Sequence, residues 1–218
     1  MPSQTKENYL KSIYALADSN GNVSLSDLSR EIGVSNPTAN NMVKKLQEQG
    51  WVRYEKYRPL QLTEQGELVA SLIIRKHRIA EMYLVEKMGF GWEEVHDIAE
   101  EMEHIDSDLL FERMDRMLDY PSVDPHGSPI PGKDGTITPV RYSKLADIEP
   151  GARVRFCALT RSPTDLLLYL NSKEISLGTE MQVIGREAFD HSTTVAYGSF
   201  DSVMLSSEVC NLLLVEIL

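Results

Sequence analysis

Residues 25–50 read LSDLSREIGVSNPTANNMVKKLQEQG, and this stretch decides how the amino-terminal part of the chain folds. Ser24 can cap a helix that begins with this stretch, and Gly33 ends that helix. Asn36 followed by Pro37 is typical of an N-cap with proline at the first helical position, so a second helix begins there and ends at the closing glycine. Two helices joined by so short a turn predict a helix-turn-helix.

The flanking sequence extends this motif into a larger unit. Residues 4–18 carry apolar side chains at helical spacing, which predicts a helix before the motif. Residues 51–63, WVRYEKYRPLQLT, hold two β-prone runs around a charged tip with Pro59, a pattern typical of a β-hairpin. A helix, a helix-turn-helix and a hairpin in this order predict a winged-helix DNA-binding domain over residues 1–74.

A helical domain is predicted over residues 75–140. One long helix covers residues 63–88, a shorter one covers 93–104, and a third follows a capping residue, Asp106 or Ser107. The third helix carries an apolar stripe, made of Leu109, Leu110, Met114, Met117 and Leu118. Such a stripe on a short helical module often pairs with its own copy, so we expect a homodimer.

The last third of the chain has a different pattern. Residues 121–139, PSVDPHGSPIPGKDGTITP, are rich in proline and glycine and mark a domain boundary. Beyond them, short β-prone runs alternate with turn residues, and only residues 162–175 have a helical pattern. Because there is room for about five strands, we predict a small SH3-like β-barrel over residues 141–218. The predicted fold class is therefore α+β.

The charge of the chain is unevenly distributed. A net charge of −11 would usually argue against nucleic-acid binding. Residues 1–74 hold 8 basic and 8 acidic residues, leaving 14 basic and 25 acidic ones, and hence all of the −11, to residues 75–218. A local basic surface lies on the second helix of the motif and the hairpin: Lys44, Lys45, Arg53, Lys56 and Arg58, against Glu48 and Glu55.

Cysteine usage and apolar runs indicate the compartment. The chain has two cysteines, Cys157 and Cys210, and no CxxC pair, which disfavours a disulfide framework and a structural zinc knuckle. The opening residues MPSQTKENYL hold no apolar core of signal-peptide length, and no run approaches the roughly 18 apolar residues of a membrane helix. These features predict a cytoplasmic protein.

Imidazoles and carboxylates gather on two of the predicted helices. His77 and Glu81 stand four residues apart and share a face of the long helix. The next helix places a second set on one side: His96, Glu100, Glu103 and His104. Oxygen and imidazole ligands without thiolates favour Mn²⁺ or Fe²⁺, and Zn²⁺ also fits on affinity grounds. The alternative interpretation is an ordinary solvated acidic helix face.

The basic surface has a specific use if it enters a DNA groove. Residues near the start of the second helix would meet base edges or backbone: Ser35, Pro37, Thr38, Asn40 and Asn41. Four cations would contact phosphates: Lys44, Lys45, Lys56 and Arg58. The alternative is a helix-turn-helix in a protein that binds no DNA.

The sequence carries no signature of catalysis. It has no Ser-His-Asp elbow, phosphate-binding loop or dinucleotide fingerprint. The tetrad EMEH at 101–104 contains the Glu-x-x-His of di-iron carboxylate enzymes, but these need a second copy and none is present. We therefore expect no catalytic residues.

The chain resembles the diphtheria toxin repressor and manganese transport regulator family of metal-dependent transcription factors. The matching segments are YLKSIYAL at 9–16, VSNPTANNMVKKLQEQGWV at 34–52, LTEQG at 62–66, RKHRIAE at 75–81, VHDIAEEMEH at 95–104 and GSPIPG at 127–132. The last part of the chain is similar to the SH3-like domain of the longer members. This resemblance implies a metal-activated homodimeric repressor that binds a palindromic operator and controls metal-uptake genes.

The resemblance also implies two metal sites in each protomer. One consists of His77, Glu81 and His96, and the other of Asn8, Glu100, Glu103 and His104. Glu100 stands where the iron-sensing members have cysteine, which is similar to the manganese branch. Asn8 replaces a more usual Asp or Met, and Lys11 stands where some manganese regulators place a glutamate ligand.

Three interpretations follow from the sequence. The first is a Mn²⁺- or Fe²⁺-activated repressor. The second is a winged-helix DNA-binding regulator whose metal sites are degraded or serve another signal, as Asn8 and Lys11 would allow. The third is a metalloenzyme, which would need an open coordination position in a cleft.

Overall fold

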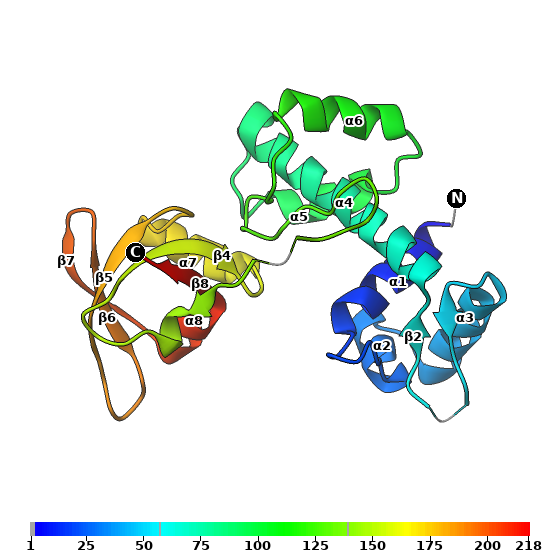
Figure 1. Ribbon diagram of the computed structural model, residues 1–218, viewed down its shortest axis with the longest axis horizontal. Helices are drawn as coiled ribbons and strands as arrows, with labels where there is room; N and C mark the ends of the chain where they lie inside the picture. The colour runs from blue at the N-terminus through cyan, green and yellow to red at the C-terminus, as the bar shows by residue number, and fades with distance from the viewer. Residues whose placement is uncertain (1–2, 57, 139) are drawn as a thin grey trace. The chain divides into compact units, whose positions relative to one another are not determined.

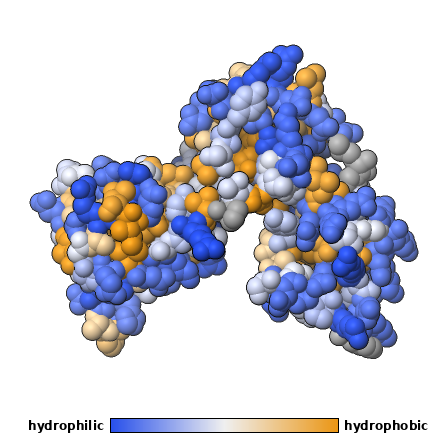
Figure 2. Space-filling model, in the orientation of Figure 1, coloured by the Kyte–Doolittle hydropathy of each residue, from blue (hydrophilic) through white to orange (hydrophobic). Residues whose placement is uncertain are grey.

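The computed structural model describes residues 3–56, 58–138 and 140–218 (Figure 1). The chain divides into two compact units. The first consists of Met1–Ala80, Ala99–Met117 and Ile130–Thr138, and the second of Glu81–Ile98, Leu118–Pro129 and Pro139–Leu218. The visible surface is mostly hydrophilic, with local apolar areas (Figure 2). Among the described residues, no helix combines the length and apolar character needed to cross a membrane.

The first unit begins with the predicted winged helix. Its elements follow the predicted order: α1 (Gln4–Leu16), α2 (Leu25–Ile32), α3 (Asn36–Glu48), β1 (Val52–Arg53) and β2 (Gln61–Leu62). Val52 pairs with Leu62 across the antiparallel hairpin. The helices bury their apolar faces in one core, where Leu10, Ile13 and Leu28 are fully buried. The winged-helix prediction is confirmed.

The N-cap of α3 differs from the prediction. The capping residue is Ser35, whose Oγ accepts a hydrogen bond of 3.3 Å from the backbone N–H of Thr38. Asn36 is the first helical residue, and its Oδ1 accepts a hydrogen bond of 2.5 Å from Oγ of Ser29 in α2. The prediction of an Asn36 cap is wrong, because this side chain joins the two helices while the preceding serine caps α3.

Three helices follow the hairpin, as predicted: α4 (Glu64–Met88), α5 (Val95–Met102) and α6 (Asp108–Met117). Oγ of Ser107, one of the two predicted caps of α6, accepts a hydrogen bond of 3.4 Å from the backbone N–H of Leu110. The apolar stripe on α6 is divided. Met114 is buried, whereas Leu109 and Met117 are 62% and 55% exposed. The exposed part of the stripe is available for contact with another molecule.

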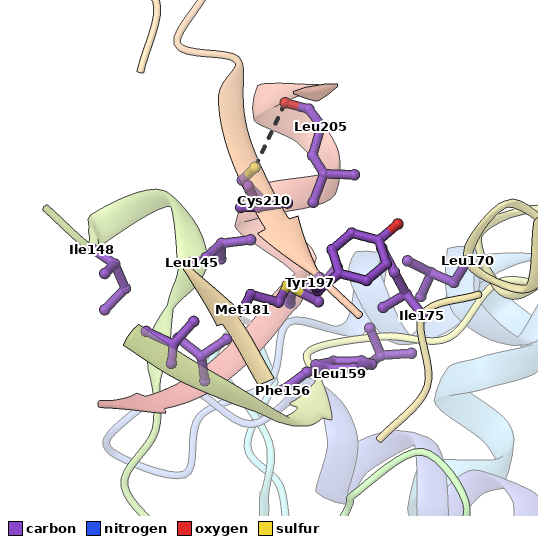
Figure 3. Packing of buried hydrophobic residues seen from close by; sticks show 14 of the residues in the cluster. Leu145, Ile148, Phe156, Leu159, Leu170, Ile175, Met181, Tyr197, Leu205 and Cys210 are labelled. Atoms are coloured by element: carbon purple, nitrogen blue, oxygen red, sulfur yellow. Dashed lines mark hydrogen bonds between the residues drawn. The ribbon is translucent and has the colours of Figure 1, made fainter. Parts of the chain in front are cut away.

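An antiparallel sheet of six strands forms most of the second unit, in the order β3-β8-β4-β5-β6-β7. Its elements are β3 (Ser143–Lys144), η1 (Leu145–Asp147), β4 (Arg153–Leu159), α7 (Thr164–Ser172), β5 (Glu180–Arg186), β6 (Thr193–Tyr197), β7 (Phe200–Leu205), α8 (Ser207–Leu212) and β8 (Leu213–Ile217). Phe156, Leu170 and Met181 are buried in its core (Figure 3). The α+β fold class with a carboxy-terminal strand-rich domain is confirmed.

Helix α8 was not predicted from the sequence. Oγ of Ser206 caps it by accepting a hydrogen bond of 3.3 Å from the backbone N–H of Val209. Cys210 lies in the core, where its Sγ contacts the carbonyl oxygen of Leu205 at 3.8 Å (Figure 3). The apolar run over residues 211–218 predicts a single strand, but its first two residues are the last two residues of α8.

A turn at residues 124–128 is held against β4. Oδ1 of Asp124 accepts a hydrogen bond of 2.8 Å from the backbone N–H of His126, and the His126 carbonyl accepts one of 3.0 Å from the N–H of Leu159. Gly127 has a φ of +85°, and a Cβ there would lie 2.2 Å from the carbonyl oxygen of Cys157. Only glycine fits this position, because both its backbone conformation and its surroundings exclude a side chain.

Gly127→Ala should therefore destabilise the second unit by roughly 2–5 kcal/mol, because backbone strain adds to overlap with β4. Gly178 is the matched control, since its φ is +87° and nothing lies within 4 Å of a Cβ built there. Gly178→Ala should cost only about 1–2 kcal/mol. Urea unfolding followed by circular dichroism measures both values, and equal costs would contradict the close packing of the turn.

Candidate metal centres and DNA-binding surface

The first group of candidate ligands lies at the carboxyl end of α5, in the first unit. Glu100, Glu103 and His104 each offer a ligand atom, and these atoms lie within 4.8 Å of one another. The backbone N–H of Glu103 still donates to the carbonyl of Ala99 at 2.9 Å, so helical geometry continues to this residue. Positions one turn apart therefore share a side, as the sequence predicted.

The hydrogen bonds of His104 orient it as a ligand. Its Nδ1 lies 2.5 Å from Oε2 of Glu7 on α1. Because the carboxylate accepts, Nδ1 carries the hydrogen, and Nε2 is left with a lone pair. Nε2 is buried, lies 3.7 Å from Oε1 of Glu103, and has no hydrogen-bond partner among the described residues. A carboxylate that fixes the tautomer of an imidazole in this way is typical of metal-binding histidines.

Asn8 supplies a second buried atom without a partner. Its Oδ1 makes no hydrogen bond to any residue that the structure describes. A buried oxygen of this kind costs about 1–3 kcal/mol if nothing binds it. An amide oxygen, an imidazole nitrogen and two carboxylates are suitable ligands for Mn²⁺ or Fe²⁺. Glu100, Glu103 and His104 form the group that the structure brings together, and the resemblance adds Asn8; these residue types fit a divalent ion.

A side-chain cation already contacts the carboxylates of this group. Nζ of Lys11 lies 2.8 and 2.9 Å from the two carboxylate oxygens of Glu103, and it also pairs with Glu100. The side chain of Glu103 is fully buried, whereas that of Lys11 is 20% exposed. The lysine of α1 thus provides positive charge beside a buried carboxylate.

His77 on α4 also belongs to this unit. Its Nδ1 lies 2.7 Å from Oε2 of Glu103 and 3.8 Å from Oε2 of Glu100. The family resemblance groups His77 with Glu81 and His96 instead, and that grouping stays a prediction. His77 and Glu81 are one turn apart on α4, where the first unit gives way to the second.

A second group of candidate ligands lies in the second unit, centred on Glu81. Ligand atoms of Glu81, Asp124 and His126 lie within 4.8 Å of one another, and all three residues are buried. Oε1 of Glu81 lies 3.3 Å from Nδ1 of His96, and Oε2 lies 3.7 Å from Nδ1 of His126. Two carboxylates and two imidazoles are therefore gathered here.

Sequence reasoning missed Asp124 and His126. Both lie in the proline- and glycine-rich segment that marks a boundary in the sequence. Periodicity gives no information there, because the residues belong to no helix or strand. The available signal was the tetrapeptide DPHG at 124–127, an aspartate and a histidine in a tight turn.

The ring of His126 has a defined orientation. Its Nε2 donates to the carbonyl oxygen of Trp92 at 2.9 Å, which leaves Nδ1 facing Glu81. Burial lowers the pKa of His126, but the carboxylates of Glu81 and Asp124 together with the Trp92 carbonyl outweigh it and raise the pKa above its ordinary value. A proton or a metal ion is favoured between Nδ1 and Glu81, and a metal ion would displace the proton.

Trp92 connects this group to the β-rich part of the second unit. Its Nε1 donates to Oδ1 of Asn171 at 2.7 Å, and its ring stacks on that of His126 with centroids 6.1 Å apart. The Asn171 amide in turn donates to Oε2 of Glu93 at 3.0 Å. Trp92 therefore connects the second group of candidate ligands to α7, which carries Asn171.

Most of the predicted DNA contacts are exposed on α3 and the hairpin: Ser35, Pro37, Thr38, Asn41, Lys44, Lys45, Lys56 and Arg58. Asn40 is partly buried, and its Oδ1 accepts a hydrogen bond of 2.9 Å from the hydroxyl of Tyr54. Arg58 forms an exposed ion pair of 3.1 Å with Glu55. Bidentate pairing with adenine needs both the oxygen and the nitrogen of a carboxamide, so Asn41 is the better placed of the two asparagines.

Two family matches cover most of the first 132 residues. Residues 1–60 match the family described as iron dependent repressor, N-terminal DNA binding domain. Residues 63–132 match the family described as iron dependent repressor, metal binding and dimerisation domain. Both families are repressors, in agreement with the expectation that the chain is not an enzyme.

Individual relatives agree with these matches. The iron-dependent repressor IdeR of Mycobacterium tuberculosis (strain ATCC 25618 / H37Rv) is 37% identical over 128 residues, which are 59% of this chain and 56% of that protein. The chain thus matches little more than half the length of this relative. The diphtheria toxin repressor of Corynebacterium efficiens is 32% identical over 202 residues, which are 86% of this chain and 87% of that protein.

A solved structure extends the similarity over nearly the whole chain. It is described as a manganese-dependent transcriptional repressor in complex with manganese, and it matches with a TM-score of 0.85 and 36% identity over 98% of this chain and 100% of that one. The resemblance stated from the sequence is confirmed. The chain belongs to the iron-dependent repressor family of metal-dependent transcriptional repressors, to which the diphtheria toxin repressor belongs.

Proposed function

We propose that this chain is a cytoplasmic, homodimeric transcriptional repressor that binds DNA when Mn²⁺ or Fe²⁺ occupies its metal centres. The observation that carries the proposal is the pair of buried atoms without hydrogen-bond partners among the described residues, Oδ1 of Asn8 and Nε2 of His104. Nε2 of His104 lies 3.7 Å from Oε1 of Glu103, and Asn8 follows Glu7, whose carboxylate accepts the hydrogen bond of His104. Buried polar atoms of this kind need a partner, and a divalent ion suits all of them.

The proposed domain limits are residues 1–74 for the winged helix, 75–140 for metal binding and dimerisation, and 141–218 for the SH3-like domain. The two family matches end at residues 60 and 132, before these limits. Leu109 and Met117 on α6 are offered as part of the dimer contact, because they are exposed apolar residues.

Two ions per protomer are proposed. Asn8, Glu100, Glu103 and His104 would hold the first, with His77 beside Glu103. Glu81 and His96 would hold the second together with Asp124 and His126, and His77 belongs to it in the grouping that the resemblance implies. The absence of cysteine from both groups favours Mn²⁺ or Fe²⁺, and Zn²⁺ is expected to bind in vitro.

The location of the first group explains how metal would control DNA binding. Glu7 and Asn8 lie on α1 of the winged helix, whereas Glu103 and His104 follow α5. Glu100, Glu103 and His104 together with Asn8 would hold a divalent ion, which would supply the positive charge between these ligands. The winged helix is then held in one orientation, and paired recognition helices need a spacing of about 34 Å to enter successive major grooves. A coupling of about 1–3 kcal/mol would change DNA affinity roughly 5- to 150-fold.

On DNA, exposed residues at the start of α3 would contact bases and backbone, and four cations would contact phosphates: Lys44, Lys45, Lys56 and Arg58. The proposed operator is palindromic, because a homodimer presents two equivalent helices. Control of metal-uptake genes rests on the family resemblance alone.

One alternative has a specific observation in its favour. Lys11 pairs with both carboxylates of the first group, so the group could be neutral enough to need no metal. The protein would then be a winged-helix regulator that responds to another signal. This alternative differs from the proposed function in one property, the dependence of DNA binding on metal.

Fluorescence anisotropy separates these functions. Chelated protein is titrated into labelled duplexes from its own upstream DNA at fixed salt, with Mn²⁺, anaerobic Fe²⁺ or Zn²⁺ added separately. The proposal expects one ion to tighten binding by about tenfold or more. Equal affinity with and without every ion would support the alternative, and no binding under any condition would remove both.

Asn8→Leu tests the first metal group by two opposite effects. The substitution keeps the approximate size of the side chain and removes the oxygen that lacks a partner, so it should raise the metal-free stability by about 1 kcal/mol. The same change should weaken Mn²⁺ binding, because a ligand is lost. Thermal unfolding and titration of free Mn²⁺ by electron paramagnetic resonance measure the two effects. Unchanged Mn²⁺ affinity would exclude Asn8 as a ligand.

Asn41→Ala and Asn40→Ala form a matched pair for DNA recognition. Asn41 is exposed, whereas the oxygen of Asn40 is engaged by Tyr54. Asn41→Ala should therefore reduce the preference for the operator over a scrambled duplex by about 1–3 kcal/mol, and Asn40→Ala should change this preference less. Anisotropy with both duplexes measures it. A larger loss of preference in Asn40→Ala would reverse the assignment.

A further inference from the structure

We propose that Lys11 is a built-in cation of the first metal group, which joins α1 to the end of α5 without metal and which a metal ion must displace. The inference rests on the proposed function, because it concerns how that group responds to a divalent ion. Lys11 lies outside the proposed ligand set, yet it would set both the affinity of the group for a metal ion and the stability of the metal-free protein.

The contacts of Lys11 carry the inference. Its ammonium lies 2.8 and 2.9 Å from the two oxygens of Glu103 and also pairs with Glu100. An ammonium offers three donors, so these three oxygens use its whole capacity. Both oxygens of the fully buried Glu103 side chain are thereby engaged, and these are the oxygens that a metal ion would need.

The position of Lys11 on α1 matches that of a proposed ligand. Asn8 and Lys11 stand three residues apart, so their side chains leave the same face of the helix. One face of α1 thus presents an amide oxygen that lacks a partner among the described residues and an ammonium that is fully engaged. The ammonium of Lys11 binds the carboxylates directly. The amide oxygen of Asn8 is itself an acceptor, so only a bound ion could join it to carboxylates.

The charges around the first group predict how Lys11 changes its affinity for metal. Three carboxylates, those of Glu7, Glu100 and Glu103, surround the group, and Lys11 offsets one of their negative charges. A divalent ion at the same oxygens would be repelled by the ammonium until the lysine side chain moves away. Lys11 therefore lowers metal affinity. It also stabilises the metal-free arrangement of α1 and α5, because Glu103 is not left buried and uncompensated.

An ordinary structural ion pair is the competing explanation. In that case metal would bind elsewhere, and loss of Lys11 would only destabilise the protein. The two explanations differ in the metal affinity of a neutral variant, which rises if Lys11 competes with metal and stays constant if it does not.

The test compares the full-length parent with Lys11→Met, and with Lys6→Met as a control that removes the same charge elsewhere on α1. Mn²⁺ affinity is measured from the paramagnetic resonance signal of the free ion. The second metal group is the same in all three proteins, so a difference reports on the first group. Lys11→Met should bind Mn²⁺ at least about tenfold more tightly than the parent, and Lys6→Met should match the parent.

Thermal unfolding provides a second readout. Without metal, Lys11→Met should melt at a lower temperature than the parent, because Glu103 loses its cation. At saturating Mn²⁺ the difference should disappear. If Lys11→Met does not fold, Lys11→Gln, which is neutral but can still donate a hydrogen bond to Glu103, is measured in its place.

The outcomes separate this inference from the proposed function. Equal Mn²⁺ affinity of the parent and the neutral variant overturns the role of Lys11 and leaves metal activation in place. A melting difference that persists at saturating Mn²⁺ also overturns it, since Lys11 would then be purely structural. If no protein in the series binds Mn²⁺ or, without oxygen, Fe²⁺, the proposed function fails together with the inference.

Discussion

The buried carboxylate of Glu103 is the constraint on which the first unit depends. A carboxylate without water must be compensated by donors or positive charge, or folding becomes unfavourable by several kcal/mol. Here Lys11 on α1 and His77 on α4 both contact it, from 92 and 26 residues away in the sequence. One side chain thus contacts both α1, the first helix of the winged helix, and the long helix α4 at the end of α5. Any change in its partners alters how these helices are held together.

The second unit repeats this arrangement with different residues. Glu81 is buried, and its two oxygens face His96 and His126. The backbone of His126 is bonded to β4, and its ring to the carbonyl of Trp92, which in turn reaches Asn171. The charge state around Glu81 is therefore connected to the packing of the β-rich domain. The β-rich domain is thereby connected to the candidate ligands around Glu81, although it lies far along the chain from that residue.

Local rules predicted most of the elements and part of the candidate site. The i, i+3, i+4 spacing of Glu100, Glu103 and His104 required only helical geometry, and the structure brings these three together as expected. The spacing could not reveal what faces them, because contacts such as that of Lys11 depend on tertiary packing. Asp124 and His126 were missed for a different reason. They lie in a turn, where neither helical nor strand periodicity indicates direction.

The contacts of Lys11 also connect two of the three interpretations that the sequence left open, the metal-activated repressor and the regulator that needs no metal. A ligand can shift an equilibrium only by the difference between its affinities for the two states. If the ammonium already holds α1 against Glu103, part of the ordered state exists without metal, and a metal ion adds less to it. A strong lysine contact therefore gives a regulator with little metal response, and a weak contact gives a steep one. The metal-activated repressor and the metal-independent regulator then differ in one quantity, the strength of the contact between Lys11 and Glu103.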